Sequence, residues 1–188
     1  MLSARVLLAD GRVVVAEPSA GIALAVRLRT RPAVRATAVR ARWDASYAAA
    51  VIDAWQRIAP AADPGVNLRL SVTAHGAEAS GLVVGTASDA EAVLGRFTAL
   101  AGVPVLPDLR EWASTPHQGC PTRTDPPAAS DAVEGLSALT AIALADHVAR
   151  SDDARLDLVP GFGGFVVEHR ASAPAWVAAS RELLRGHH

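Results

Sequence analysis

Strict alternation between apolar and polar side chains is the feature that most limits what this chain can fold into. Residues 21–29 and 66–73 both alternate in this way. A period of two puts the apolar side chains on one face of an extended strand, which is typical of an antiparallel sheet covered on one side. Asp10-Gly11 lies between two apolar runs and is a strong signal for a β-hairpin. The sequence therefore predicts a largely antiparallel sheet with one buried face.

Segments of helical period separate the predicted strands. Asp44 is a favourable N-cap for a first helix, which Pro60 is expected to end. A second helix is expected to begin at Ser88, whose hydroxyl would form a capping box with Glu91. The side chains expected to face inward recur at helical spacing: Tyr47, Val51, Trp55 and Ile58 in the first helix, and Leu94, Phe97 and Leu100 in the second.

The rest of the chain continues this mixture of strands and helices. Extended segments are expected at residues 33–43, 81–87, 103–111 and 155–159, and residues 114–129, which contain four prolines, are expected to form a loop. Helices are expected at about residues 137–150, with Leu139, Ile142 and Val148 inward, and from Ser172 onward. No internal sequence repeat is evident. This order predicts an α+β fold, with helices packed on one face of a largely antiparallel β-sheet.

Composition bounds the class of protein. With 188 residues, the chain is expected to form a single domain, residues 1–188, that buries a core without disulfides or metal. A net charge of −1 gives no electrostatic attraction for nucleic acid or an anionic membrane, so neither is expected as a partner. The single cysteine, Cys120, excludes an intrachain disulfide and a cysteine-based zinc site. The chain lacks a membrane-spanning apolar run and a signal-peptide core, which predicts a cytoplasmic protein.

Motifs of established chemistry are few. The glycine cluster at residues 161–164 lacks the Lys-Ser/Thr of a phosphate-binding loop and is better interpreted as a turn between strands. The histidines show no metal-binding spacing apart from the terminal pair, and no GxSxG nucleophile elbow is present. Nothing in the sequence marks the Cys120 thiol as activated. We therefore expect no metal ligands and no residues that bind a cofactor.

Several short segments resemble the substrate-binding domain of FAD-linked oxidases of the berberine-bridge type, in the vanillyl-alcohol-oxidase-like flavoprotein superfamily. They are ADGR at residues 9–12, residues 21–32, WQ at 55–56 with APAA at 59–62, VVG at 83–85 before residues 88–100, LVPGFGG at 158–164 and HR at 169–170. Their shared order and spacing carry the resemblance, since none is specific alone. The resemblance covers most of the chain and implies this domain's fold.

The regions that contact flavin in this family have no match in the sequence. Residues 17–20 stand where the family has a tryptophan- and glycine-rich segment that contacts the flavin. The family's N-terminal flavin domain and its flavin-contacting C-terminal tail are also unmatched. The loss of the internal segment in particular favours a protein that has abandoned FAD, so we expect no cofactor.

The resemblance implies that the polar side of the strands faces the substrate. Arg27 and Arg69 are expected to bind substrate there, and three aromatic residues are expected to line the cavity if they share that face: Trp43, Phe162 and Phe165. The best candidates for polarising a carbonyl or moving a proton are His75, Glu168 and His169. For these three, the alternative is a surface histidine and a structural ion pair.

Three classes of function remain open. The first is a flavin-independent, redox-neutral cyclase (an isomerase) that closes a ring in a polyketide-like intermediate of natural-product or antibiotic biosynthesis. Such a closure, whether pericyclic in the hetero-Diels–Alder manner or an oxa-cyclisation, needs a folded substrate and one or two hydrogen-bond donors. The second is the substrate-binding subunit of a split FAD-dependent oxidoreductase, and the third is a non-catalytic protein that binds a hydrophobic metabolite. A hydrophobic small molecule is the expected ligand, and the uncovered sheet face predicts a homodimer.

Overall fold

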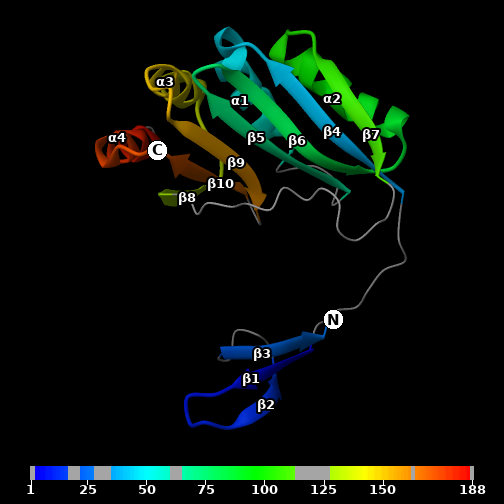
Figure 1. The fold of residues 1–188 in the computed structure, drawn as a ribbon, viewed down its shortest axis with the longest axis vertical. Coiled ribbons are helices and arrows are strands. Elements are labelled where there is room, and N and C mark those ends of the chain that lie inside the picture. The colour runs from blue at the N-terminus through cyan, green and yellow to red at the C-terminus, as the bar shows by residue number, and fades with distance from the viewer. Residues whose placement is uncertain are drawn as a thin grey trace. The chain divides into compact units, whose positions relative to one another are not determined.

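The computed structural model describes residues 3–16, 22–27, 35–59, 65–112, 128–161 and 164–186. The chain divides into two compact units, residues 1–33 and residues 34–188. Each unit has a sheet of its own (Figure 1).

The first unit is a three-stranded antiparallel sheet in the order β2-β1-β3. Its strands are β1 (Ser3–Leu7), β2 (Val13–Ala16) and β3 (Ile22–Arg27). The predicted hairpin at Asp10-Gly11 is confirmed, since β1 pairs with β2. Gly11 has a φ angle of 81°, a conformation that favours glycine, and Asp10 accepts a bond from the Arg12 backbone N–H at 3.0 Å.

The second unit contains a seven-stranded antiparallel sheet in the order β7-β4-β6-β5-β9-β10-β8. Its strands are β4 (Ala36–Trp43), β5 (Val66–Thr73), β6 (Gly76–Val84), β7 (Leu106–Trp112), β8 (Ala129–Val133), β9 (Arg155–Gly161) and β10 (Gly164–Arg170). Its helices are α1 (Ala48–Ile58), α2 (Ala87–Ala101), α3 (Ala138–Ala149) and α4 (Pro174–Arg185). The helices lie on one face of the sheet, so the predicted α+β fold is confirmed (Figure 1). No helix in the described ranges is long and apolar enough to cross a membrane.

The topology of this unit is a repeat that the sequence does not reveal. Elements β4-α1-β5-β6-α2-β7, with strand order β7-β4-β6-β5, form a ferredoxin-like βαββαβ unit. Elements β8-α3-β9-β10-α4 follow the same path, with no fourth strand among the residues that the structure describes. The two repeats join where β5 pairs with β9, from Leu70 opposite Leu158 to Thr73 opposite Arg155.

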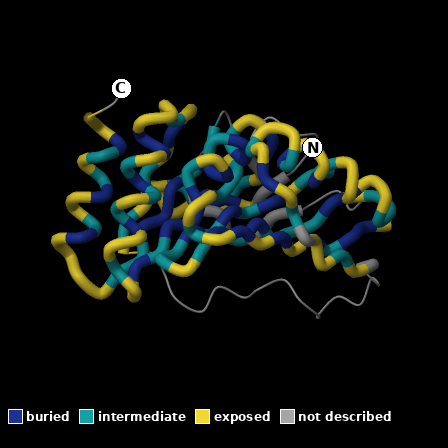
Figure 2. The backbone as a smooth tube through the Cα atoms, turned by 90° about the horizontal axis from the view of Figure 1, so that it is seen from above, coloured by how far each residue is buried: buried dark blue, intermediate teal, exposed yellow. Residues whose placement is uncertain are grey.

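The core lies between the helices and the apolar face of this sheet. Trp55 in α1 is fully buried, and its indole N–H donates to the Leu68 carbonyl at 3.0 Å. The Phe165 ring meets Trp55 edge-on, with ring centroids 5.2 Å apart. Figure 2 shows buried residues alternating with less buried ones along the elements. This pattern is what the periods of 2.0 and 3.6 predict for strands and helices that each have one covered side.

The predicted capping box of the second helix was wrong in position. Helix α2 begins at the N-cap Thr86, whose hydroxyl accepts from the Asp89 backbone N–H, while the Asp89 carboxylate accepts from the Thr86 backbone N–H at 2.7 Å. This capping box lies two residues before the predicted Ser88–Glu91 box, because Thr86 and Asp89 already satisfy the same geometry. Asp44 is the N-cap of a short 3-10 helix, Ala45–Tyr47, that leads into α1, but its side chain makes no capping bond.

The predicted inward face of α3 was also wrong in part. Leu139 and Ile142 are 68% and 47% exposed, whereas Val148 is buried as predicted. The remaining inward side chains are Thr140, Ala141 and Leu144. Helix α3 contacts α1, and the face that it buries carries two small side chains, Thr140 and Ala141. Tyr47 and Leu100, also predicted to face inward, are 41% and 45% exposed.

Candidate functional site

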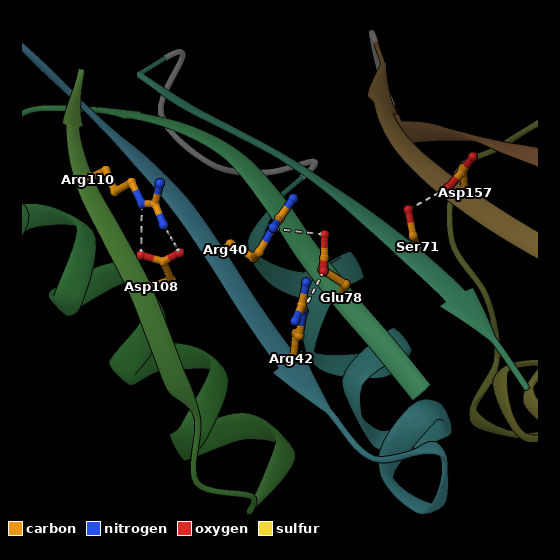
Figure 3. A network of polar contacts seen from close by, with 7 residues as sticks. All are labelled: Arg40, Arg42, Ser71, Glu78, Asp108, Arg110 and Asp157. Atoms are coloured by element: carbon orange, nitrogen blue, oxygen red, sulfur yellow. Dashed lines mark hydrogen bonds and ion pairs between the residues drawn. The ribbon is translucent and has the colours of Figure 1, made fainter. Parts of the chain in front are cut away.

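The open face of the seven-stranded sheet, opposite the helices, carries a row of aligned polar side chains. The register places Arg42, Glu78, Ser71, Asp157, Glu168 and Ser130 opposite one another across β4, β6, β5, β9, β10 and β8. Because side chains alternate along each strand, all of them project to the same side. Figure 3 shows part of this row.

Asp157 is the centre of a buried charge cluster. Its side chain is fully buried, and its Oδ2 accepts from Arg155 Nη2 at 2.6 Å and from Arg170 Nε at 2.8 Å. Its Oδ1 accepts from the Ser71 hydroxyl at 2.5 Å. Burial alone would raise the pKa of Asp157, but the bonds from Arg155 and Ser71 and the charges of Arg155 and Arg69 hold it below its usual value. Asp157 is therefore ionised and fixes two guanidinium groups in place.

Glu78 is the centre of a second, more exposed cluster. Its Oε2 lies 2.7 Å from Arg42 Nε, and its Oε1 lies 3.3 Å from Arg40 Nε (Figure 3). On strands β4, β6, β5, β9 and β10, the open face carries five arginines and three carboxylates: Arg40, Arg42, Arg69, Arg155, Arg170, Glu78, Asp157 and Glu168. The formal charge of this part of the face is +2.

A cavity of about 880 Å³ lies at the end of the sheet where β4 ends and where β5 turns into β6. Its polar wall contains Arg42, Ser71, Thr73, His75, Glu78 and Arg155, and its apolar wall contains Trp43, Tyr47, Val103 and Pro104. Trp43 is 6% exposed, and its buried indole N–H has no hydrogen-bond partner among the described residues. A buried donor of this kind is normally satisfied, so Trp43 is an exception in this structure. Within the described ranges, no group of three or more His, Cys, Asp or Glu could hold a metal ion.

His169 belongs to a buried network on the opposite face of the sheet. Its Nδ1 lies 2.9 Å from the Ser180 hydroxyl of α4, and its Nε2 lies 3.1 Å from Oδ2 of Asp131 in β8. Arg181 donates two bonds of 2.8 Å to the same carboxylate. The contact of Nε2 with Asp131 is close in distance, and the tautomer of the ring decides whether Nδ1 donates to the Ser180 hydroxyl or accepts from it. The network joins α4 to β10 and β8.

This Ser–His–Asp arrangement is not a nucleophilic site. Both Ser180 and His169 are fully buried, so their side chains cannot reach a substrate. Burial lowers the pKa of His169 more than the Asp131 carboxylate raises it. His169 is therefore neutral at pH 7 and has a structural role in this geometry.

The lowered pKa of His169 predicts a dependence of stability on pH. When unfolded, His169 takes up a proton near its ordinary pKa of 6.5, but the folded protein binds that proton only at lower pH. The unfolded state therefore binds more protons below pH 6.5, and we expect the free energy of unfolding to fall between pH 7.5 and pH 5.5. Urea denaturation at several pH values measures this slope.

A His169→Gln variant is expected to flatten this slope, whatever its stability at pH 7.5. The matched control, His75→Gln, replaces an exposed histidine and is expected to keep the wild-type slope. Equal slopes for wild type and His169→Gln would show that His169 is not the group that titrates.

The structure brings some of the predicted site residues together and separates others. His75 and Trp43 line the same cavity, and Arg69 lies on the open face beside Asp157. Glu168 lies on that face too, whereas His169 points toward α4. Phe162 lies outside the described residues, and Arg27 ends β3 in the other unit.

The condition that the aromatic residues share the polar face is not met by Trp43 and Phe165. Phe165 is 2% exposed and packs on Trp55, and Trp43 packs on Phe97 of α2 with ring centroids 5.9 Å apart. Both therefore point to the helix side. Trp43 reaches the cavity because it is the last residue of β4, where the cavity meets the strand end.

Sequence reasoning identified Arg69 and Glu168 on the open face but missed Asp157, Arg155 and Arg42. Asp157 is a lone carboxylate in a strand whose neighbours, Leu156 and Leu158, are fully buried. A single acid within such an apolar run is the signal that could have identified it, because a buried charge requires partners. Arg155 and Arg42 carry no comparable signal.

Comparison with solved structures identifies the fold. The chain has the fold of the C-terminal, substrate-binding half of berberine-bridge-type FAD-linked oxidases. A BBE-like 1 structure from Physcomitrella patens matches 98% of this chain and 54% of its own, with a TM-score of 0.71 and 14% identity. A variant of berberine bridge enzyme matches 100% and 51%, with a TM-score of 0.67 and 12% identity. The xylooligosaccharide oxidase of Myceliophthora thermophila matches 99% and 54%, with a TM-score of 0.67 and 15% identity.

The predicted resemblance is thus confirmed at the level of fold. The chain spans about half the length of the structures it matches. No protein family model matches the sequence, and no curated protein matches it.

Proposed function

We propose that this chain is a flavin-independent, redox-neutral cyclase that acts on a polyketide-like intermediate. The observation that carries the proposal is the cavity of about 880 Å³, which lies within the size range of small-molecule sites. It combines an aromatic wall with hydrogen-bond donors. A second support is internal to the sequence: only five residues separate β2 from β3, where the resembled oxidases have their flavin-contacting segment.

In this mechanism, the cavity folds a linear substrate so that its reacting ends meet. Trp43 and Tyr47 pack against the apolar chain of the substrate. Because the bound substrate is already held in the folded geometry, the entropy cost of ring closure is met on binding and not in the chemical step. A donor on the polar wall, His75 or Arg42, polarises a carbonyl and stabilises the charge that develops on its oxygen. No atoms or electrons enter or leave, so the product is an isomer of the substrate.

The test is turnover of linear polyene substrates that carry an activated alkene or carbonyl. Mass spectrometry of the reaction with purified protein is expected to show a product of unchanged mass with a new chromatographic retention time. His75→Gln or Arg42→Gln is expected to lower kcat by about tenfold or more if that residue is the donor. The matched control is Arg110→Gln, which removes an exposed arginine of the same sheet face outside the cavity.

Two results would contradict the cyclase. A product that is lighter by two hydrogens, or a requirement for an added flavoprotein, would place the chain in a redox reaction. Tight binding of every substrate with no conversion would instead support a metabolite-binding protein.

The charge of the open face favours a second candidate, the substrate-binding subunit of a split oxidoreductase. Arg40 and Arg42 have side chains that are 54% and 68% exposed, and the face around them has a formal charge of +2. Such a face suits an acidic partner better than a second copy of itself, because like charges across an interface repel. The homodimer stays a prediction, which sedimentation at micromolar concentration would test.

A further inference from the structure

We infer that the ligand of the cavity is an amphiphilic acid: an apolar chain with a carboxylate that binds between Arg42 and Arg155. The inference rests on the proposed function only in that the same cavity is the ligand site. It would hold equally for a substrate that is converted and for a ligand that is merely carried.

Arg155 is the preorganised half of this carboxylate site. Its Nε and Nη2 both donate to Oδ2 of the buried Asp157, at 3.0 and 2.6 Å. This contact fixes the guanidinium plane, while 42% of the side chain stays exposed and lines the cavity. Arg170 also donates to Asp157, so this carboxylate is shared between two arginines and does not neutralise Arg155 fully.

Arg42 lies on the same open face of the sheet as Arg155 and also lines the cavity. The register places Thr73 opposite Arg155, and Glu78 opposite both Arg42 and Ser71. Strands β4 and β9 are three strand spacings apart, or about 14 Å. Arg42 contacts Glu78 through Nε only, and Glu78 is shared with Arg40. Its terminal nitrogens have no carboxylate partner among the described residues, so they are available to a ligand.

The apolar wall of the cavity fits the hydrocarbon chain of an amphiphilic acid. Tyr47, Val103 and Pro104 are apolar or largely apolar, and Trp43 adds an aromatic surface. A carboxylate held by guanidinium groups forms strong charge-assisted hydrogen bonds, whereas a neutral head group would leave the two arginines without an added partner. The cavity therefore distinguishes an acid from its neutral analogue.

Octanoate and 1-octanol are matched probes, since they share the apolar chain and differ in charge. Isothermal titration calorimetry is expected to show octanoate binding at least tenfold more tightly than 1-octanol, with an affinity that weakens as salt concentration rises. Arg42→Gln and Arg155→Gln are each expected to weaken octanoate binding by about tenfold and to leave 1-octanol binding unchanged.

Arg110→Gln is the control, because Arg110 pairs with Asp108 on the same face and does not line the cavity. The Arg42→Gln variant is expected to fold normally, because Arg42 is 68% exposed and makes no contact with the buried Asp157. A loss of octanoate binding in this variant would therefore not come from a folding defect. Equal affinity for the two probes, or an equal loss in Arg110→Gln, would overturn the inference.

Failure of this inference can be told apart from failure of the cyclase proposal. Arginine-dependent octanoate binding by a protein that converts no linear precursor would refute the cyclase and keep the acid site. Conversion of neutral precursors as fast as their carboxylate forms would keep the cyclase and refute the acid site.

Discussion

Replacing Asp157 with alanine is expected to lower the free energy of unfolding by about 3–5 kcal/mol. The carboxylate is fully buried and accepts bonds from Ser71, Arg155 and Arg170. Its removal leaves the largely buried guanidinium of Arg170 without this counter-charge. Breaking a buried ion pair from one side costs far more than the pair contributes, because the remaining charge stays desolvated. Urea denaturation at pH 7 measures the change.

Asp108→Ala is the matched control for this experiment. Asp108 pairs with Arg110 at 3.1 Å on the same face, but its side chain is 50% exposed. An exposed pair contributes less than about 1 kcal/mol, so the control is expected to change stability little. If Asp157→Ala cost no more than Asp108→Ala, the buried cluster would not be a structural centre of the open face.

Trp55→Ala is expected to lower the free energy of unfolding by about 3–5 kcal/mol. Trp55 is fully buried between the sheet and the helices, and the truncation leaves a cavity beside Phe165. It also leaves the Leu68 carbonyl without the bond from the indole N–H. Thermal or chemical denaturation followed by circular dichroism would measure the loss.

Leu139→Ala provides the comparison, since it truncates an apolar side chain of a helix at a position that is 68% exposed. A change within about 0.5 kcal/mol is expected there. Trp55→Phe keeps most of the volume and separates the contribution of the hydrogen bond from that of packing. A similar loss for Trp55→Ala and Leu139→Ala would mean that Trp55 is not a core residue in solution.

The strands and the first helix could be predicted because each has one covered side. In β5, Leu68, Leu70 and Val72 are all fully buried, as the alternation predicts. In α1, Val51, Trp55 and Ile58 are fully buried at helical spacing. The local period of the apolar residues determines which side chains share a face, so the buried face of an element can be predicted from a single sequence.

Features that depend on contacts between distant segments could not be predicted in this way. The pairing of β5 with β9 joins residues 86 positions apart, as the Ser71–Asp157 bond shows. The same holds for the network of His169, Ser180 and Asp131, in which the sequence singles out His169 but not its two partners. Strand β8 was missed because residues 129–133 (ASDAV) combine weak strand formers with no strict alternation.

The ferredoxin-like repeat bears on why the ligand-sized cavity lies where it does. The two repeats of the second unit have the same topology and join at β5 and β9. They approximate an internal two-fold arrangement with the Ser71–Asp157 pair at the junction. Val103 and Pro104, which close one side of the cavity, lie in the connection from α2 to β7. Strand β7 is the element of the first repeat that has no equivalent among the described residues of the second. One side of the cavity therefore comes from the connection that leads to the strand by which the two repeats differ among the described residues.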